Sequence, residues 1–292
     1  MRYQNWITGL TLAVMILAAV AAAGGVFMTG GPGPATHLSV HGQEVELYGR
    51  GLYRYMSAEL AVQGIAQDYV TLFLAVPLLG AGLIWASTGS AAGKLFLAGM
   101  LGYTLVTYLF YLVMAMYNAF FLLYAALLGL SFHALLLTLF EITIPELEEL
   151  FAGGKPVRFA GGFLVVNGVN VGLLWLGRVA PPLLDGSIYP ESLEHYTTLI
   201  VQGLDLGLLL PFSIILGVLL WRRTPMGLLG APVYLVFLSV MMIALVAKII
   251  AIGMAGGEIV PPVFVIPPAA VVTIYCAVRM LQAPKPAAAV AG

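Results

Sequence analysis

Eight long apolar runs constrain the fold of this chain more than any other feature of its sequence. A helix needs about 20 mainly apolar residues to cross the hydrocarbon core of a bilayer. The runs cover 7–28, 68–87, 95–115, 118–140, 159–179, 200–221, 227–250 and 262–281. Glycine, proline or charged residues separate them, as in short connections between helices. We therefore expect an all-α fold, a polytopic transmembrane bundle of about eight helices.

The composition of the chain supports a membrane assignment, because 61% of its 292 residues are hydrophobic and only 9% are charged. Soluble domains contain about 25% charged residues, so this chain lacks the polar surface that would cover a globule in water. The lipid bilayer is therefore its expected main partner. The only basic cluster is the pair Arg222 and Arg223, which argues against nucleic-acid binding. The single cysteine, Cys276, excludes an intrachain disulfide and a cysteine-rich metal site.

The lysines and arginines between the runs predict the orientation, because they are enriched in cytoplasmic loops. If the N-terminus is cytoplasmic, only three arginines face outward, and the others face the cytoplasm. The outward group is Arg50, Arg54 and Arg178, and the inward group is Arg2, Lys94, Lys155, Arg158, Arg222, Arg223, Arg279 and Lys285. We expect a protein of the cell inner membrane with both termini cytoplasmic. The first run also resembles a signal peptide, but it is long enough to span, and we expect it to be retained as a helix.

The outer segment at about 34–58 alternates apolar and polar residues on both sides of His41-Gly42. This alternation predicts a small β-hairpin. We assign residues 1–282 to a single transmembrane domain that includes this hairpin. The alanine- and proline-rich tail, 283–292, is expected to be disordered.

The inner segment at about 143–154 predicts a short acidic helix on the cytoplasmic side. Thr143 and Glu146 have the spacing of a capping box, with a proline in the first turn. Glu148 and Glu149 follow, and Gly153-Gly154 ends the helix. Anionic lipid repels such a helix, so we expect it to pack on its own chain, beside Lys155 and Arg158.

The second and sixth runs resemble each other. Each has Gln and Asp at its outer end, a proline near the middle (Pro77 and Pro211) and a tryptophan at its inner end. Both run in the same direction, which predicts a parallel four-plus-four repeat about an axis along the membrane normal. The spacing from Asp to Pro differs between the two runs, so two independently similar helices are the alternative.

Ionisable and polar residues near the outer ends of the spans are the strongest functional signal. A charged side chain at a helix centre costs about 2.5–3.5 kcal/mol on insertion scales. An outward-facing polar vestibule that binds a small solute or ion would explain such residues at one depth. They are Asp68, Asp205, Lys248, Gln67, Gln202 and Arg178. The alternative is that both carboxylates cap helix N-termini and that Lys248 extends to the interface.

A second polar cluster is predicted deeper in the membrane from His133, Asn167 and Asn170. A membrane histidine serves as a proton relay or haem ligand, or more commonly as a hydrogen-bonded packing residue. The third run carries a stripe of Tyr103, Thr107, Tyr108 and Tyr111. Such a stripe either lines a polar or quinone-like pocket or, more commonly, makes hydrogen bonds between helices.

Several short motifs resemble a group of bacterial multipass membrane proteins to which no activity is assigned. They are Gly51-Leu-Tyr-Arg-Tyr55, Gln67-Asp68-Tyr-Val-Thr71, Tyr117-Asn118 and Gln202-Gly-Leu-Asp205-Leu-Gly207. The resemblance covers about residues 40 to 250. It supports the choice of the residues near the outer ends of the spans and implies no particular function. Met56 stands where the group usually has an aspartate after GLYRY, so any role of that carboxylate is absent here.

Three classes of function follow from these observations. The first is transport or binding of a small solute or ion through the vestibule. The second is an accessory or sensory membrane subunit that docks another membrane protein, or a second copy of itself, through the hairpin and the acidic helix. The third, an intramembrane enzyme or cofactor carrier, has least support, because the chain has no P-loop, HExxH, GxSxG or CxxC motif. We therefore expect no catalytic residue, metal or cofactor.

Overall fold

The computed structural model describes residues 2–152 and 155–282, and in this part of the chain eight helices are long and apolar enough to cross a membrane. The spans are α1 (Gln4–Phe27), α2 (Ala58–Val70) with α3 (Val76–Ser87), α4 (Ala91–Met114), α5 (Phe121–Phe140), α7 (Val157–Leu184), α8 (Ile200–Leu204) with α9 (Leu210–Trp221), α10 (Pro225–Met254) and α11 (Pro262–Leu281). The elements outside the spans are β1 (Ala35–Leu38), β2 (Glu44–Leu47), α6 (Ile144–Phe151) and the 3-10 turns η1 (Gly51–Tyr53) and η3 (Glu191–Leu193). The all-α prediction is confirmed, and the chain is an integral multipass membrane protein. The predicted tail 283–292 and the Gly153-Gly154 helix stop lie outside the described residues.

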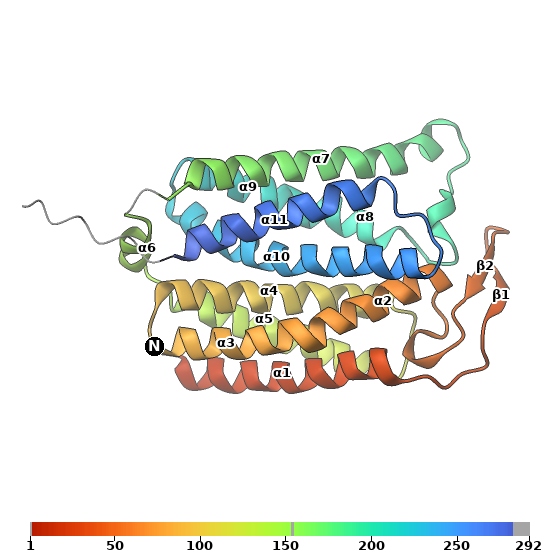
Figure 1. The fold of residues 1–292 in the computed structure, drawn as a ribbon, viewed down its shortest axis with the longest axis horizontal. Coiled ribbons are helices and arrows are strands. Elements are labelled where there is room, and N and C mark those ends of the chain that lie inside the picture. The colour runs from red at the N-terminus through yellow and green to blue at the C-terminus, as the bar shows by residue number, and fades with distance from the viewer. Residues whose placement is uncertain (1, 153–154, 283–292) are drawn as a thin grey trace, which may run out of the picture.

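The spans lie side by side along the long axis of the molecule (Figure 1). At one end lie β1, β2 and the segment 185–199, and we call this the hairpin end. At the other end lie α6 and the start of α1, and we call this the α6 end. The second span begins at Ala58, ten residues earlier than its hydrophobicity predicts. Its polar first turns, capped by the Ser57 hydroxyl, explain why a hydropathy window misses them.

The predicted hairpin is confirmed. β1 pairs antiparallel with β2, with His37 opposite Val45, and Gly42 takes a φ of +82° in the turn. The hairpin contacts the segment between α7 and α8, because the Gln43 amide donates to the Glu191 carbonyl over 2.9 Å. The loops that follow α1 and α7 therefore meet over the hairpin end.

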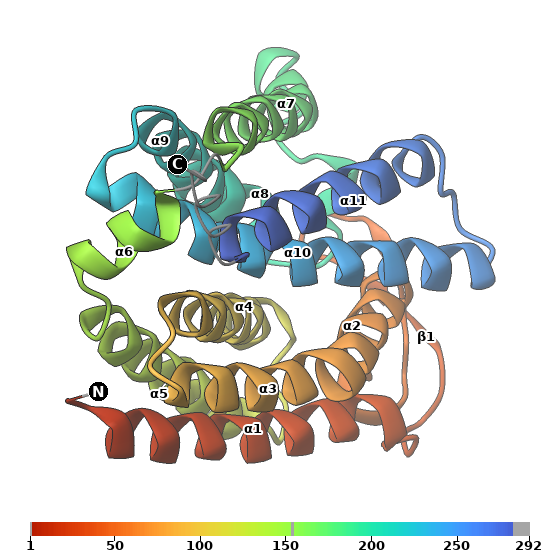
Figure 2. The ribbon, with the colours of Figure 1, turned by 60° about the vertical axis from the view of Figure 1, so that its left-hand side comes forward.

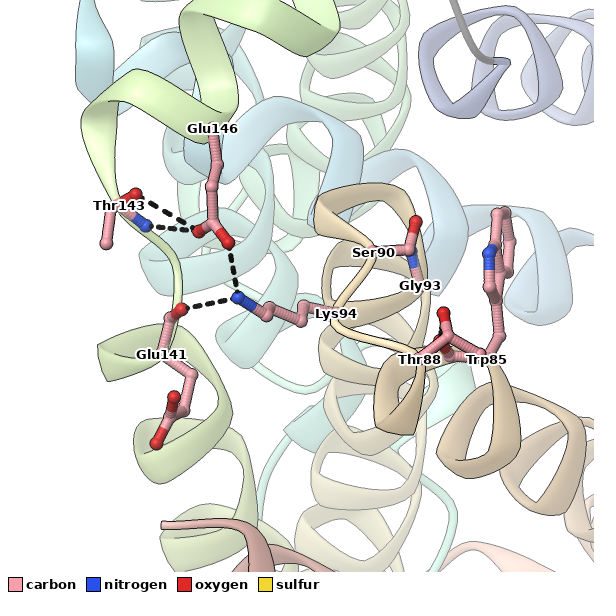
Figure 3. A network of polar contacts seen from close by, with 8 residues as sticks. All are labelled: Trp85, Thr88, Ser90, Gly93, Lys94, Glu141, Thr143 and Glu146. Atoms are coloured by element: carbon pink, nitrogen blue, oxygen red, sulfur yellow. Dashed lines mark hydrogen bonds and ion pairs between the residues drawn. The ribbon is translucent and has the colours of Figure 1, made fainter. Parts of the chain in front are cut away.

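The short acidic helix α6 is confirmed, and it packs on its own chain. Lys94, which is 4% exposed on α4, donates to Glu146 over 2.7 Å and to the Glu141 carbonyl over 2.9 Å (Figure 3). The Lys155 ammonium lies 4.6 Å from the centre of the Phe151 ring, as the sequence predicted. Arg158 is exposed, and an arginine from the turn after α9, Arg223, instead donates to the Phe151 carbonyl over 2.7 Å.

The second and sixth spans contain the same interruption. Each includes a five-residue π-helical segment, η2 (Thr71–Ala75) in one and η4 (Asp205–Leu209) in the other. A twelve-residue helix follows each, with a proline at its second position, Pro77 in α3 and Pro211 in α9. The two interruptions are offset by 134 residues, from 71 to 205.

The same offset continues through the next turn and helix. Ser90 caps α4 by accepting from the Gly93 amide, and Thr224 caps α10 by accepting from the Gly227 amide. A Cβ on Gly93 would lie 2.7 Å from the Trp85 carbonyl, and one on Gly227 would lie 2.4 Å from the Leu219 carbonyl. The second and third spans therefore share their local structure with the sixth and seventh, as the predicted parallel repeat requires, and α6 lies between these two halves of the chain.

The central helices of the two halves, α4 and α10, pack against each other (Figure 2). Gly99 makes this close approach, because a Cβ there would lie 2.4 Å from Val236 and 2.8 Å from the carbonyl of Val233. Val233 is the counterpart of Gly99 under the 134-residue offset. A contact between a residue and its own counterpart is expected at a two-fold axis. Here such an axis is approximate and relates the two halves.

Candidate functional site

The carboxylate of Asp68 lies inside the bundle and is 1% exposed. It accepts a hydrogen bond from the Tyr53 hydroxyl and another, over 3.0 Å, from the Tyr111 hydroxyl. On the side of α1, a Cβ at Gly25 would lie 1.6 Å from the Asp68 carboxylate. Segments from α1, η1, α2 and α4 therefore enclose this side chain.

Tyr53 reaches Asp68 because of the turn that precedes it. Gly51 has a φ of +56°, which favours glycine, and a Cβ there would lie 2.0 Å from the Met28 carbonyl. The 3-10 turn η1 then directs Tyr53 inward, where it is 2% exposed. Burial, and then the charge of Asp68, raise the pKa of the Tyr53 hydroxyl well above its ordinary value. The hydroxyl therefore stays protonated and donates to the carboxylate.

Further tyrosines surround this pair. The Tyr108 and Tyr124 rings stack with centroids 5.9 Å apart, and both pack edge-on against Tyr111. Tyr108 donates to the Ala18 carbonyl over 3.3 Å. We call Tyr53, Tyr108, Tyr111 and Tyr124 the tyrosine cage. The predicted aromatic stripe therefore makes hydrogen bonds between helices, and Tyr111 also lines a cavity.

Gln67 lies beside Asp68 in α2 and is 3% exposed. Its amide nitrogen donates to the Tyr103 hydroxyl over 2.7 Å, while its amide oxygen is buried and has no partner among residues 2–152 and 155–282. The Thr71 hydroxyl donates to the Gln67 carbonyl over 2.9 Å and lies 3.0 Å from the Tyr103 hydroxyl. These hydrogen bonds form a polar layer between the second span and α4, next to Asp68 in the sequence.

The alternative that Asp68 caps a helix N-terminus is wrong, because Asp68 lies ten residues after Ala58, at which α2 begins. Asp205 also does not cap a helix N-terminus, because it lies five residues after Ile200, at which α8 begins. Its carboxylate accepts from the Trp175 indole of α7 over 2.8 Å. Each carboxylate is thus held by an aromatic hydrogen-bond donor.

Lys248 lies on α10, which packs against both α2 and α9. It makes no direct ion pair with either carboxylate, since the only such pair among residues 2–152 and 155–282 joins Lys94 and Glu146. The structure therefore places Lys248 on a helix that contacts both spans that carry a carboxylate, one in each half.

Two other predicted site residues lie on α8 and α7. Gln202 is half-buried in α8, three residues before Asp205. Arg178 is exposed on α7, and within the described part of the chain it makes no ion pair. Arg178 therefore makes no direct ion pair with either carboxylate.

The predicted deeper cluster does not form. His133 lies on α5 in the first half, exposed, with Nδ1 2.7 Å from the Gly129 carbonyl of its own helix. Asn167 and Asn170 lie on α7, on the other side of α4 and α10 (Figures 1 and 2). The sequence placed the three residues at a similar depth in the membrane. Depth alone does not show which helices are neighbours.

No protein-family model, curated protein or solved structure matches this chain. The resemblance to the group with the GLYRY loop therefore stays a prediction. What the site can do chemically follows from its geometry alone.

Three contributors to the site were not singled out from the sequence as such. Tyr53 lies in the GLYRY motif, which was noted for its resemblance to other proteins, but no role was assigned to its tyrosines. Gly25 and Trp175 carry no local signal, because a glycine or a tryptophan in a span commonly serves packing or interfacial anchoring. Only the arrangement of α1 and α7 against the two carboxylate-bearing spans identifies them.

Proposed function

We propose that this chain is a membrane transport protein that binds a small ion or solute between its two halves. In this proposal Asp68 is the central binding group, and Lys248 and Asp205 complete the charged group. Gln67 and Gln202 supply neutral hydrogen-bonding groups nearby. The observation that carries the proposal is the carboxylate of Asp68, which is 1% exposed and accepts from two tyrosine hydroxyls but forms no direct ion pair within the part of the chain that the structure describes.

A purely structural role explains Asp68 poorly. Retaining a charge inside a membrane helix costs about 2.5–3.5 kcal/mol on insertion scales, and apolar residues of similar volume commonly pack as well or better. Exchange of a proton or a small cation at this carboxylate during a transport cycle would explain why the residue is retained despite this cost. The phenols of Tyr53 and Tyr111 would then stabilise the charged form while the site is empty.

The π segments η2 and η4 support the same proposal. π-helical turns inside α-helices occur frequently at functional sites. Asp205 begins η4, while η2 follows Asp68 by three residues at Thr71. The irregular backbone therefore lies at the carboxylates in both halves of the repeat, as in the interrupted helices of many transporters.

The distribution of basic residues supports an orientation with the hairpin end outside and both termini cytoplasmic. Arg50 and Arg54 lie near the hairpin, and Arg178 lies in the hairpin-end part of α7. Lys94, Lys155 and Arg223 lie at the α6 end. By the positive-inside tendency, we propose an inner-membrane protein whose Asp68 lies nearer the outer surface.

Cation and proton flux in proteoliposomes tests the proposal. Vesicles loaded with a pH-sensitive dye would receive an inward gradient of Na⁺ or K⁺, and the internal pH would be followed. We expect a cation- or voltage-driven pH change with the wild-type chain, reduced at least about tenfold in Asp68→Asn, since one carboxylate interaction is worth more than about 1.4 kcal/mol.

Glu59→Gln is the matched control, because Glu59 lies on the same helix as Asp68 but is exposed. Its flux should equal that of the wild type. A flux that survives in Asp68→Asn would remove Asp68 from the pathway. A wild-type signal equal to that of empty vesicles for H⁺, Na⁺ and K⁺ would refute ion transport.

Docking of a membrane partner is the second candidate, and one observation favours it. Leu147, Leu150 and Phe151 of α6 are buried on the protein, while Glu148 and Glu149 are exposed. An acidic pair on an anchored helix would suit a basic partner surface. Loss of a co-purifying membrane protein in a Glu148→Lys, Glu149→Lys double variant would support docking, and an unchanged set of co-purifying proteins would count against it.

A further inference from the structure

Asn170 is an exposed polar residue in the middle of α7. It lies thirteen residues after Val157 and fourteen before Leu184, the two ends of this 28-residue helix. About 20 residues of a helix cross the hydrocarbon core of a bilayer, and every run of 20 residues within α7 includes Asn170. Its amide therefore lies in the hydrocarbon region.

The neighbours of Asn170 on the helix surface show that it faces lipid. These are the residues three and four positions away. Val166, Leu173 and Leu174 are exposed and apolar, so they line no watery space. The remaining neighbour, Asn167, is half-buried. Two amides therefore lie one turn apart at the border of an apolar surface.

Neither asparagine has a hydrogen-bond partner within the chain as described. Among residues 2–152 and 155–282, Trp175 is the only α7 side chain that makes a hydrogen bond, and it donates to Asp205. An unpaired amide is costly in hydrocarbon, because lipid tails neither donate nor accept hydrogen bonds. Asparagine side chains in spans commonly bond across to another helix. Asn170 therefore requires a polar partner that these residues do not supply.

The face of α7 that carries Asn170 is open to another helix. α7 lies at the margin of the bundle, where it packs along α9 (Figure 2). The Tyr275 ring of α11 lies edge-on to Phe159, with centroids 6.2 Å apart, but Phe159 lies eleven residues before Asn170. Gly177 follows Asn170 by seven residues, about two turns, and nothing lies within 4 Å of a Cβ built there. A second helix can approach closely at this glycine.

We propose that two copies of this chain associate through α7, with the two Asn170 amides hydrogen-bonded to each other. An amide both donates and accepts, so two identical amides related by a two-fold axis complete each other. Copies of one chain insert in the same orientation, so this axis lies along the membrane normal and brings both Asn170 side chains to one depth. A different membrane protein would match this depth only by coincidence.

Arg178 also lies on α7 and would repel its counterpart if it lay at the contact. It follows Asn170 by eight residues, which turns it about 80° away around the helix axis. It also lies six residues before Leu184, so its long side chain can extend toward the interface. The charge of Arg178 therefore does not oppose the pairing of Asn170.

Single-molecule photobleaching of the full-length chain in liposomes tests the association. The chain would carry one fluorophore at its N-terminus, and bleaching steps would be counted over a range of protein-to-lipid ratios. We expect two-step events to increase with the density of the wild-type chain. Asn170→Leu should raise the dissociation constant about tenfold, which corresponds to about 1.4 kcal/mol for the two symmetric hydrogen bonds. Asn170→Gln retains the amide and should retain most of the association.

His133→Leu is the matched control. His133 is also an exposed polar residue in a span, but its Nδ1 lies 2.7 Å from the Gly129 carbonyl of its own helix. Its dissociation constant should equal that of the wild type. Equal weakening in Asn170→Leu and His133→Leu, or in neither, would overturn the assignment. Circular dichroism would verify that each variant is folded.

Cross-linking in the membranes of expressing cells identifies the partner. The single cysteine, Cys276, is buried, so Leu174→Cys supplies one accessible thiol a turn from Asn170. With copper phenanthroline as oxidant, we expect a disulfide-linked product of twice the mass of the chain. Phe132→Cys, exposed on α5, should give none. A Leu174→Cys product of another mass would assign this face to a different membrane protein, and no product would leave it facing lipid. Either result would overturn the proposal.

This inference goes beyond the proposed transport function and does not depend on it. A chain that dimerises but gives no flux would refute transport and leave the α7 contact in place. A chain that gives flux dependent on Asp68 but bleaches in single steps at every density would refute the dimer alone.

Discussion

Asp68 shows how a single charged side chain can depend on residues far from it in the sequence. Gly25 leaves the space that the carboxylate occupies, and Tyr53 and Tyr111 provide its hydrogen-bond donors. Each of the three belongs to a different element. The environment of Asp68 therefore exists only after α1, η1 and α4 have packed around α2.

Gly25→Ala tests the space beside Asp68. A Cβ would lie 1.6 Å from the carboxylate oxygen, so α1 or Asp68 must move, and overpacking of this kind costs about 1–3 kcal/mol. We expect a lower unfolding temperature in detergent. Gly9→Ala, on the same helix with nothing within 4 Å of the new Cβ, should be neutral or slightly stabilising because alanine favours helix. Equal unfolding temperatures for the two variants would refute the close contact.

Tyr53→Phe tests the hydrogen bond from the GLYRY turn. The substitution leaves Asp68 with Tyr111 as its one remaining hydroxyl donor, and an underpaired buried carboxylate costs about 1–3 kcal/mol. Tyr55→Phe, in the same motif but exposed, provides the control and should change stability by less than about 0.5 kcal/mol. Urea unfolding that gives the same free energy for both variants would show that Tyr53 does not hold Asp68.

At the scale of elements, α6 follows directly from its sequence. The capping-box spacing of Thr143 and Glu146 is realised, since the Thr143 amide donates to the Glu146 carboxylate over 2.9 Å. The other carboxylate oxygen accepts from Lys94. One glutamate thus starts the helix and also fixes it to α4 (Figure 3).

The pH dependence of Glu146 gives a test of this anchor. Burial raises the pKa of Glu146, but hydrogen bonds from Lys94 and Thr143 outweigh it, and the pKa is lowered from 4.5. Its stabilisation is therefore complete above about pH 4.5 and is lost as the pH falls through the lower, folded value. Glu146→Gln should reduce the unfolding temperature at pH 7, and the reduction should become smaller as the pH falls below 4.5 towards 3.

Glu149→Gln, on the exposed face of α6, should leave the unfolding temperature unchanged at both values of pH. If Glu146→Gln and the wild type differ equally at pH 7 and pH 3, the ion pair with Lys94 does not anchor α6.

Local sequence patterns predicted the elements well and the contacts between them only in part. Apolar length identifies spans, and a capping box identifies α6, because both depend on neighbouring residues. Asp68, Asp205 and Lys248 could be selected because a charge in a span is costly. Arg178 and His133 were selected by the same reasoning, yet they point away, because the rotation of a helix about its axis depends on its neighbours.

At the scale of the whole molecule, the repeat explains a discrepancy in the sequence. Aligning the two spans by their aspartates gives unequal distances to the prolines, whereas the structural offset of 134 residues, seen from Pro77 to Pro211, equalises them. In that register Gln202 corresponds to Asp68, and Asp205 corresponds to Thr71. The halves therefore share a backbone but place their carboxylates one turn apart, which gives the site its asymmetry.

Separate expression of the two halves would test whether the repeat is also a unit of assembly. A chain ending at residue 152 and a second chain beginning at 155 should associate in the membrane, because α4 and α10 pack closely at Gly99. Gly99→Leu should abolish co-purification of the halves, since a Cβ would already lie 2.4 Å from Val236. Gly129→Leu, on α5 with open space around it, should not. If the halves of Gly99→Leu still co-purify, the interface between the halves does not depend on this contact.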